Sequence, residues 1–222
     1  MTVVVMNAWQ ILFKGGPMMW PILLLSITAL AIGINKVIYV LSIEKKLLVE
    51  QQTFLNSLQA GKLKDTLRLC ESKPGILAGI LKAGVLRFGC SREVIRGSMD
   101  EVVDQEGEAL KQNMPLLALI VNLSPLLGLL GTANAMAVVF HAVVVRSNVL
   151  NPLTAGELAG GIWQALLTTV AGLVVAILSL ALHGICAARI NAVIAHMERS
   201  AAQMVNILQQ LAELKRGSED IS

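Results

Sequence analysis

The stretch MPLLALIVNLSPLLGLLGTANAMAVVFHAVV, residues 114–144, contains no aspartate, glutamate, lysine or arginine. A helix needs about 20 mostly apolar residues to cross the hydrocarbon core of a bilayer. This segment, extended to Val145, is therefore long enough to cross a membrane and to project beyond it. Residues 18–41 and 158–187 satisfy the same length criterion. The sequence thus predicts an all-α, polytopic membrane protein with three transmembrane helices.

The composition supports a membrane protein and argues against several other classes. Hydrophobic residues make up 55% of the 222 residues and charged residues only 15%, with a mean hydropathy of +0.68. A soluble domain carries about 25% charged residues, so a disordered chain, a nucleic-acid-binding protein and a disulfide scaffold are not expected. The cysteines Cys70, Cys90 and Cys186 have no metal-ligand spacing and are expected to be packing thiols. No metal, cofactor or enzymatic activity is expected, because HExxH, GxSxG and paired intramembrane carboxylates are all missing.

The basic residues predict the orientation in the membrane. Twelve lysines and arginines lie between Lys36 and Lys111 and four follow the third span, whereas the opposite side has only Lys14 and Arg146. Because lysine and arginine concentrate on the cytoplasmic side, the N-terminus is expected outside and the C-terminus inside. The first apolar run is too long for a cleaved signal peptide and is expected to be a retained span.

Apolar periodicity predicts that the cytoplasmic parts are helical and extend the spans below the membrane. Short helices are expected around residues 43–58, 62–72 and 76–89, and a longer one is expected to begin at Ser91 and to continue into the second span. The predicted order along the chain is a periplasmic segment (1–17), the first span (18–41), a cytoplasmic helical loop (42–112), the second span with an extension (113–145), a periplasmic loop (146–157), the third span (158–187) and a cytoplasmic C-terminal helix (188–222).

A few polar and small residues interrupt the second and third spans. Small residues four apart let helix backbones approach closely, which predicts helix packing at Gly128, Gly131, Gly161 and Gly172. Polar side chains are costly against lipid and are expected to face protein or a water-filled cavity. The polar candidates are Asn122, Asn134, Gln164, Thr168 and His183, together with Ser179. For each residue taken alone, a purely structural role is the alternative, such as a threonine hydroxyl bonded to its own helix.

No aspartate, glutamate, lysine or arginine lies within the second or third span. A chain that moved protons unaided would be expected to hold an ionisable group in the membrane. His183 is the best internal candidate but lies toward the cytoplasmic end. A proton carrier would therefore belong to another subunit.

Three segments resemble the MotA/TolQ/ExbB proton-channel family, with the closest likeness to its TolQ/ExbB branch. They are GGPMMWPILLLSITALAI (15–32), LSPLLGLLGT (123–132) and GIWQALLTTVAGLVVAI (161–177). The resemblance implies that Thr132 and Thr169 are pore threonines and that Gln164 stands at a ring-lining position. Together with Thr168, Asn134 and His183, which are polar residues of the same two spans, they are expected to line the pore or a proton path.

The resemblance also implies partners and a location. They are a homo-oligomeric ring, expected to be a pentamer, a small single-span ExbD- or TolR-like subunit with an intramembrane aspartate, and a TonB- or TolA-like protein that receives mechanical work. The ring is expected in the lipid of the bacterial inner membrane, with no nucleic-acid partner. Gln164 departs from the family's glutamate and Leu178 from its proline. The alternative is therefore a structural ring or scaffold of the same architecture that does not conduct.

Overall fold

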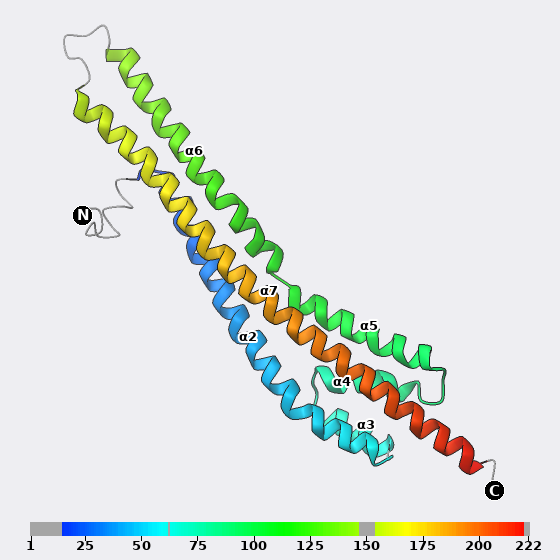
Figure 1. The fold of residues 1–222 in the computed structure, drawn as a ribbon. Helices are drawn as coiled ribbons and strands as arrows, with labels where there is room; N and C mark the ends of the chain where they lie inside the picture. The colour runs from blue at the N-terminus through cyan, green and yellow to red at the C-terminus, as the bar shows by residue number, and fades with distance from the viewer. Residues whose placement is uncertain (1–14, 62, 147–153, 220–222) are drawn as a thin grey trace. The chain divides into compact units, whose positions relative to one another are not determined.

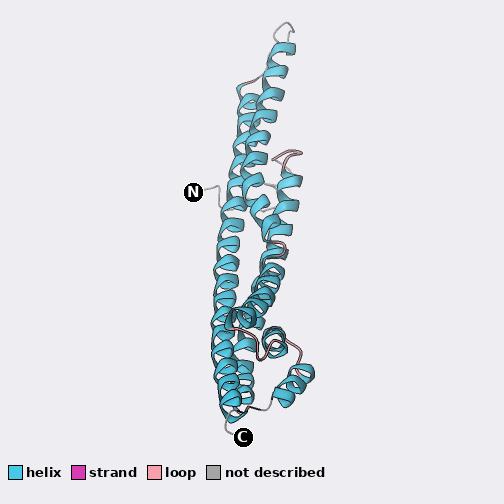
Figure 2. Cartoon of the chain, turned by 90° about the vertical axis from the view of Figure 1, so that its right-hand side faces the viewer, coloured by secondary structure: helices cyan, strands magenta, loops and turns pink. Residues whose placement is uncertain are grey.

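The computed structural model describes residues 15–61, 63–146 and 154–219. Within these three ranges every regular element is an α-helix and there is no strand (Figure 2). In chain order (Figure 1) the helices are α2 (Met19–Gln59), α3 (Leu63–Ser72), α4 (Ile76–Leu86), α5 (Arg92–Lys111), α6 (Met114–Arg146) and α7 (Ala155–Glu219).

Three segments are long and apolar enough to cross a membrane. They are α2, the stretch Arg92–Arg146 that contains α6, and α7. The prediction of an all-α, polytopic membrane protein with three spans is confirmed.

The described chain forms two compact units. The membrane unit contains residues 15–35, 113–146 and 154–185, and the helical extension contains residues 36–61, 63–112 and 186–219. Helices α2 and α7 each contribute residues to both units. Most of the predicted N-terminal segment 1–17, with Lys14, and most of the loop 146–157 lie outside the described residues.

The helical extension has a continuous apolar core. Helix α4 packs against α3 and α5, and Gly84 of α4 lies so close to α5 and α7 that an added Cβ would meet the Met99 and Leu208 side chains. The apolar stripes predicted on α2 and α7 supply much of this core. Its fully buried members include Phe54, Leu58, Leu77, Leu81, Ile95, Met99, Ile190, Met197 and Leu208.

Polar contacts at the edge of this core tie α7 to α2 and α5. Arg189 forms an ion pair with Glu44 at 3.6 Å. The Gln51 side-chain amide donates to the side-chain Oε1 of Gln203 at 3.1 Å, and the guanidinium of Arg92 donates to the side-chain Oδ1 of Asn206 at 2.8 Å. These exposed pairs lie beside the faces that the apolar core already brings together.

The membrane unit buries less of its apolar surface. A small core joins Ala29, Leu117 and Ile120 and is flanked by Leu25, Ile32 and Leu182. Many large apolar side chains remain exposed on the outer faces, among them Leu24, Ile27, Leu126, Leu129, Leu173 and Ile177. A surface of this kind is stable against lipid or neighbouring apolar helices and would be costly in water.

The predicted continuous helix from Ser91 into the second span is wrong. Helix α5 ends at Lys111, and α6 begins at Met114. Pro115 has no N–H to donate to the carbonyl four residues earlier, which weakens a helix that continues through it. In the structure it stands in the first turn of α6, where that N–H would have no partner within the helix. Asn113 takes a positive φ of 69°, a conformation that asparagine tolerates better than most residues. At the C-terminal end of α5, the Gln112 carbonyl oxygen accepts a hydrogen bond from the Lys36 ammonium at 2.8 Å.

The third span and the C-terminal amphipathic segment belong to one helix. Helix α7 runs without interruption from Ala155 to Glu219. Gly184 is the one helix-breaking residue near the junction of the two segments, and no proline follows it, so the helical hydrogen bonding continues. The span and the amphipathic segment differ in which of their residues are apolar, and the backbone of the helix is the same in both.

Candidate functional site

Helices α6 and α7 form an antiparallel pair in backbone contact. An added Cβ on Gly172 would lie 2.6 Å from the Ser124 carbonyl oxygen and 3.0 Å from the Gly128 Cα. An added Cβ on Gly128 would lie 3.1 Å from the carbonyl oxygen of Thr168. Only glycine permits backbones this close, because a side chain would need the space that the other helix occupies.

The remaining small residues continue the same contact in register. An added Cβ on Gly131 would lie 2.7 Å from the Thr168 hydroxyl oxygen, and one on Gly161 would overlap Val139. Residue numbers rise along α6 as they fall along α7, as an antiparallel hairpin requires. All four predicted packing glycines therefore lie at the α6–α7 contact.

Two threonines from the two spans meet beside this glycine contact. The Thr132 and Thr169 hydroxyls are in direct contact, and both are partly buried. Thr132 Oγ1 also lies 3.2 Å from the Gly128 carbonyl oxygen and 3.3 Å from that of Ala165. Thr169 Oγ1 lies 3.2 Å from the same Gly128 carbonyl. The helices must approach this closely for the short hydroxyls to reach across.

The hydroxyl pair has more acceptors than protons to donate. Each hydroxyl carries one hydrogen, whereas the neighbouring acceptors are two backbone carbonyls and the other hydroxyl. The hydrogens can therefore be redistributed by rotating the two hydroxyls. Such a pair can orient water or pass a hydrogen bond onward, but it has no carboxylate or imidazole with which to hold an extra proton.

Thr168 has a different environment from Thr169. Its side chain is buried, and its hydroxyl donates to the Ala165 carbonyl of its own helix at 2.8 Å. It lies against Gly131 on α6. Ser124 and Ser179 are buried as well, and the Ser124 hydroxyl donates to the Ile120 carbonyl at 2.8 Å. In the single chain, these hydroxyls are arranged as packing groups.

Gln164 lies against the turn that precedes α2. Gly16 in this turn has a φ of +76°, and an added Cβ there would overlap the Gln164 amide nitrogen. The Gln164 side chain is half-buried. Position 164 thus carries a neutral amide in contact with the N-terminal turn.

The other predicted polar residues lie away from the threonine pair. Asn134 is exposed and His183 is half-buried. Asn122 is also exposed, and its amide donates to the Ala118 carbonyl of its own helix at 3.1 Å. The structure of the single chain therefore brings together Thr132 and Thr169 but does not bring Asn134 or His183 to them.

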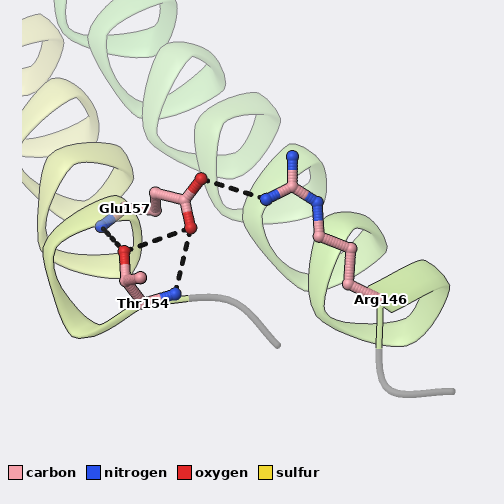
Figure 3. A network of polar contacts seen from close by, with 3 residues as sticks. All are labelled: Arg146, Thr154 and Glu157. Carbon is pink, nitrogen blue, oxygen red and sulfur yellow. Dashed lines mark hydrogen bonds and ion pairs between the residues drawn. The ribbon is translucent and has the colours of Figure 1, made fainter. Parts of the chain in front are cut away.

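A polar network that was not predicted joins the end of α6 to the start of α7 (Figure 3). Glu157 accepts hydrogen bonds from the Thr154 backbone N–H at 3.0 Å and from the Thr154 hydroxyl at 3.1 Å. The Glu157 N–H donates back to the Thr154 hydroxyl at 3.3 Å, and Arg146 forms an ion pair with Glu157 at 3.0 Å. The T-x-x-E spacing of a helix-capping box is the sequence signal that would have revealed this arrangement.

These contacts lower the pKa of the Glu157 carboxyl. Hydrogen bonds from the Thr154 backbone contribute most, followed by those from Arg146 and from the Thr154 hydroxyl. Each favours the charged form of the carboxylate. Glu157 therefore stays ionised at pH values where an ordinary glutamate is partly protonated.

The described residues contain no cluster of three or more His, Cys, Asp or Glu that could hold a metal ion. A cavity of about 650 Å³ in the membrane unit is lined by α2 and α6 and is almost entirely apolar. Its one hydroxyl, on Thr28, already donates to the Leu24 carbonyl at 2.7 Å. No ionisable side chain lines this cavity.

Comparison with known proteins places the chain in a family. Residues 72–199 match the model of the MotA/TolQ/ExbB proton channel family, which is more than half of the chain and includes both threonines and Gln164. The chain belongs to the MotA/TolQ/ExbB proton channel family. The resemblance seen in the second and third spans is thereby confirmed at the level of the family.

Relatives of this MotA/TolQ/ExbB family member bear ExbB-like names. A Synechocystis sp. protein named as ExbB-like 1, a biopolymer transport protein, is 30% identical over 171 residues, which cover 75% of this chain and 65% of the relative. The ExbB-like 3 protein of the same organism is 30% identical over 149 residues, 60% of this chain and 70% of the relative. An ExbB homolog from Methanothermobacter thermautotrophicus is 30% identical over 101 residues, 46% of this chain and 34% of the relative. The chain thus spans less than two thirds of the first relative's length.

Proposed function

We propose that this chain is the ring-forming subunit of a proton channel complex of the TolQ/ExbB type in a bacterial inner membrane. The N-terminus faces the periplasm and the C-terminus faces the cytoplasm. Several copies, five by family resemblance, surround the spans of a small ExbD- or TolR-like subunit. Proton entry through the ring drives mechanical work on a TonB- or TolA-like protein.

The contact between Thr132 and Thr169 carries this proposal. Two uncharged hydroxyl groups meet there at one level of the α6–α7 hairpin. Each of them can both donate and accept a hydrogen bond. The membrane unit, as described, has no carboxylate in the interior of its spans. A proton that passes this level needs a carrier from outside the chain, and an intramembrane aspartate on the small subunit would supply one.

The test is proton uptake by liposomes that contain this chain co-purified with its small partner subunit. We expect Thr132→Val and Thr169→Val each to lower uptake at least ten-fold, because valine keeps the shape of threonine but has no hydroxyl. Ser179→Ala is a matched control that removes a buried hydroxyl elsewhere on α7 and should retain uptake. Full uptake by both valine variants would refute the assignment of the threonine pair to the proton path.

Gln164 favours the second candidate, a structural ring that does not conduct. A neutral amide in contact with Gly16 replaces the family's titratable carboxyl. This candidate predicts a stable complex with the partner and no proton uptake above that of empty liposomes. Gln164→Glu would then be the variant in which uptake appears.

A further inference from the structure

The membrane unit has only two fixed charges in its described residues, and they are paired with each other. Neither residues 15–35 nor residues 113–145 contain an Asp, Glu, Lys or Arg, and between Glu157 and Ile185 there is no other. Arg146 closes α6, and Glu157 lies in the first turn of α7. About half of each side chain is exposed, 49% for Arg146 and 47% for Glu157. These two charges therefore meet water at the end of the hairpin.

Stability alone gives a weak reason for this pair. Ion pairs with this much exposure contribute little to folding, since water already solvates both partners. The start of α7 is held by the reciprocal hydrogen bonds between Thr154 and Glu157. A glutamine at position 157 could still accept the backbone hydrogen bond, since capping boxes use Glu or Gln. The charge of Glu157 is therefore separable from its capping role.

We propose that Glu157 keeps the outer mouth of the channel permissive for cations by neutralising Arg146. This inference rests on the proposed function, which places the ends of α6 and α7 around the periplasmic entrance of a ring. With Glu157 charged, each chain contributes no net charge there. Without it, each chain contributes one uncompensated guanidinium, and the ring presents a positive mouth to an approaching proton.

The size of the effect follows from Coulomb's law and salt screening. For a ring of about five chains with each charge about 10 Å from the ion in water, an uncompensated guanidinium in every chain lowers the local cation concentration roughly ten-fold at about 10 mM salt. At about 1 M salt the Debye length falls to roughly 3 Å, and the same ring then lowers the local cation concentration by less than about 1.2-fold. A dependence on ionic strength is thus the signature of this role.

The test measures proton uptake under an inward pH gradient, with a trapped pH-sensitive dye, by the reconstituted complex of the full chain and its small partner. We expect Glu157→Gln to lower uptake about ten-fold at low salt and to match the original protein at high salt. The double variant Arg146→Gln/Glu157→Gln should recover uptake at low salt, although it lacks the ion pair. Glu213→Gln, which removes an exposed carboxylate of the helical extension, should leave uptake unchanged at both salt concentrations.

Three outcomes would overturn the inference, and a fourth would refute the proposed function on which it rests. Unchanged uptake by Glu157→Gln at low salt would show that the charge has no effect on cation entry. A loss that persists at high salt, or that the double variant does not recover, would show a structural role. Absence of uptake by the original complex would refute the proposed function itself, and the three variants would then be indistinguishable from it.

Discussion

Replacing Gly172 by alanine tests the closest helix contact in the membrane unit. The new Cβ would lie 2.6 Å from the Ser124 carbonyl oxygen, and ordinary van der Waals contact requires about 3.4 Å. Because the obstacle is backbone, α6 and α7 must separate by about 0.8 Å at this level. The hydrogen bond from Thr169 to the Gly128 carbonyl, now 3.2 Å, would then lengthen to about 4.0 Å and be lost.

The energetic cost can be isolated with a matched control. Gly184 lies on the same helix, and an added Cβ there meets nothing within 4 Å. Both substitutions change helix propensity equally, so their difference in stability reports the steric term, about 1–3 kcal/mol for overpacking. For a chain of this size, that difference corresponds to a melting temperature about 3–9 °C lower for Gly172→Ala than for Gly184→Ala.

The assay is thermal unfolding of the two purified variants in the same detergent, followed by proton uptake in liposomes. Gly172→Ala should unfold at the lower temperature and lose uptake, because its threonine pair is pulled apart. Equal melting temperatures together with equal uptake would refute the argument that the glycine contact positions the two hydroxyls.

Two further predictions concern groups outside the spans. Maleimide at neutral pH should label about one thiol per chain, at the exposed Cys90. Cys70 should react slowly, because it is buried and its burial raises the pKa of the thiol. Rapid labelling that survives Cys90→Ser would contradict this. Thr154→Ala should raise the pKa of Glu157 toward its ordinary value, because the hydroxyl that favours the carboxylate is removed, and carboxyl carbon NMR titration would detect the shift. A carboxyl with a lowered pKa contributes stability that is present above its unfolded-state pKa and is lost as the pH falls through its folded-state value. Thr154→Ala should therefore reduce the acid sensitivity of stability in that window, and an unchanged titration would show that the hydroxyl does not act on the carboxyl.

The spans and the apolar stripes could be predicted because each depends on a local pattern. A run of apolar residues longer than a bilayer core can be recognised without knowing its neighbours, and the stripe that includes Ile190, Met197 and Leu208 is buried as its spacing predicts. The break between α5 and α6 also has a local signal, since Pro115 disfavours the preceding helical turn. The apolar continuity on both sides of it outweighed that signal and led to the wrong prediction of one helix.

The contacts of the candidate site depend on register, which local patterns do not specify. Two pairs of small residues four apart on α6, Gly128 with Thr132 and Gly131 with Ala135, indicate a helix that another can approach closely. This spacing does not say which α7 residue lies opposite. The contact between Thr132 and Thr169 follows only when Gly128 meets Gly172. The environment of Gln164 was equally non-local, because the turn at Gly16 that touches it lies more than a hundred residues away in sequence.

The pairing of Arg146 with Glu157 has a consequence for how a transmembrane voltage acts on the protein. The free energy of one elementary charge changes by about 2.3 kcal/mol for every 100 mV of membrane potential through which the charge moves. The two fixed charges of the membrane unit are opposite in sign and 3.0 Å apart. Moving them together through the membrane potential therefore changes their electrical free energy by almost nothing. In the proposed complex, voltage would therefore do electrical work on an ion, or on a charged group that another chain brings into the membrane. The parts of α6 and α7 in the membrane unit carry no net fixed charge of their own.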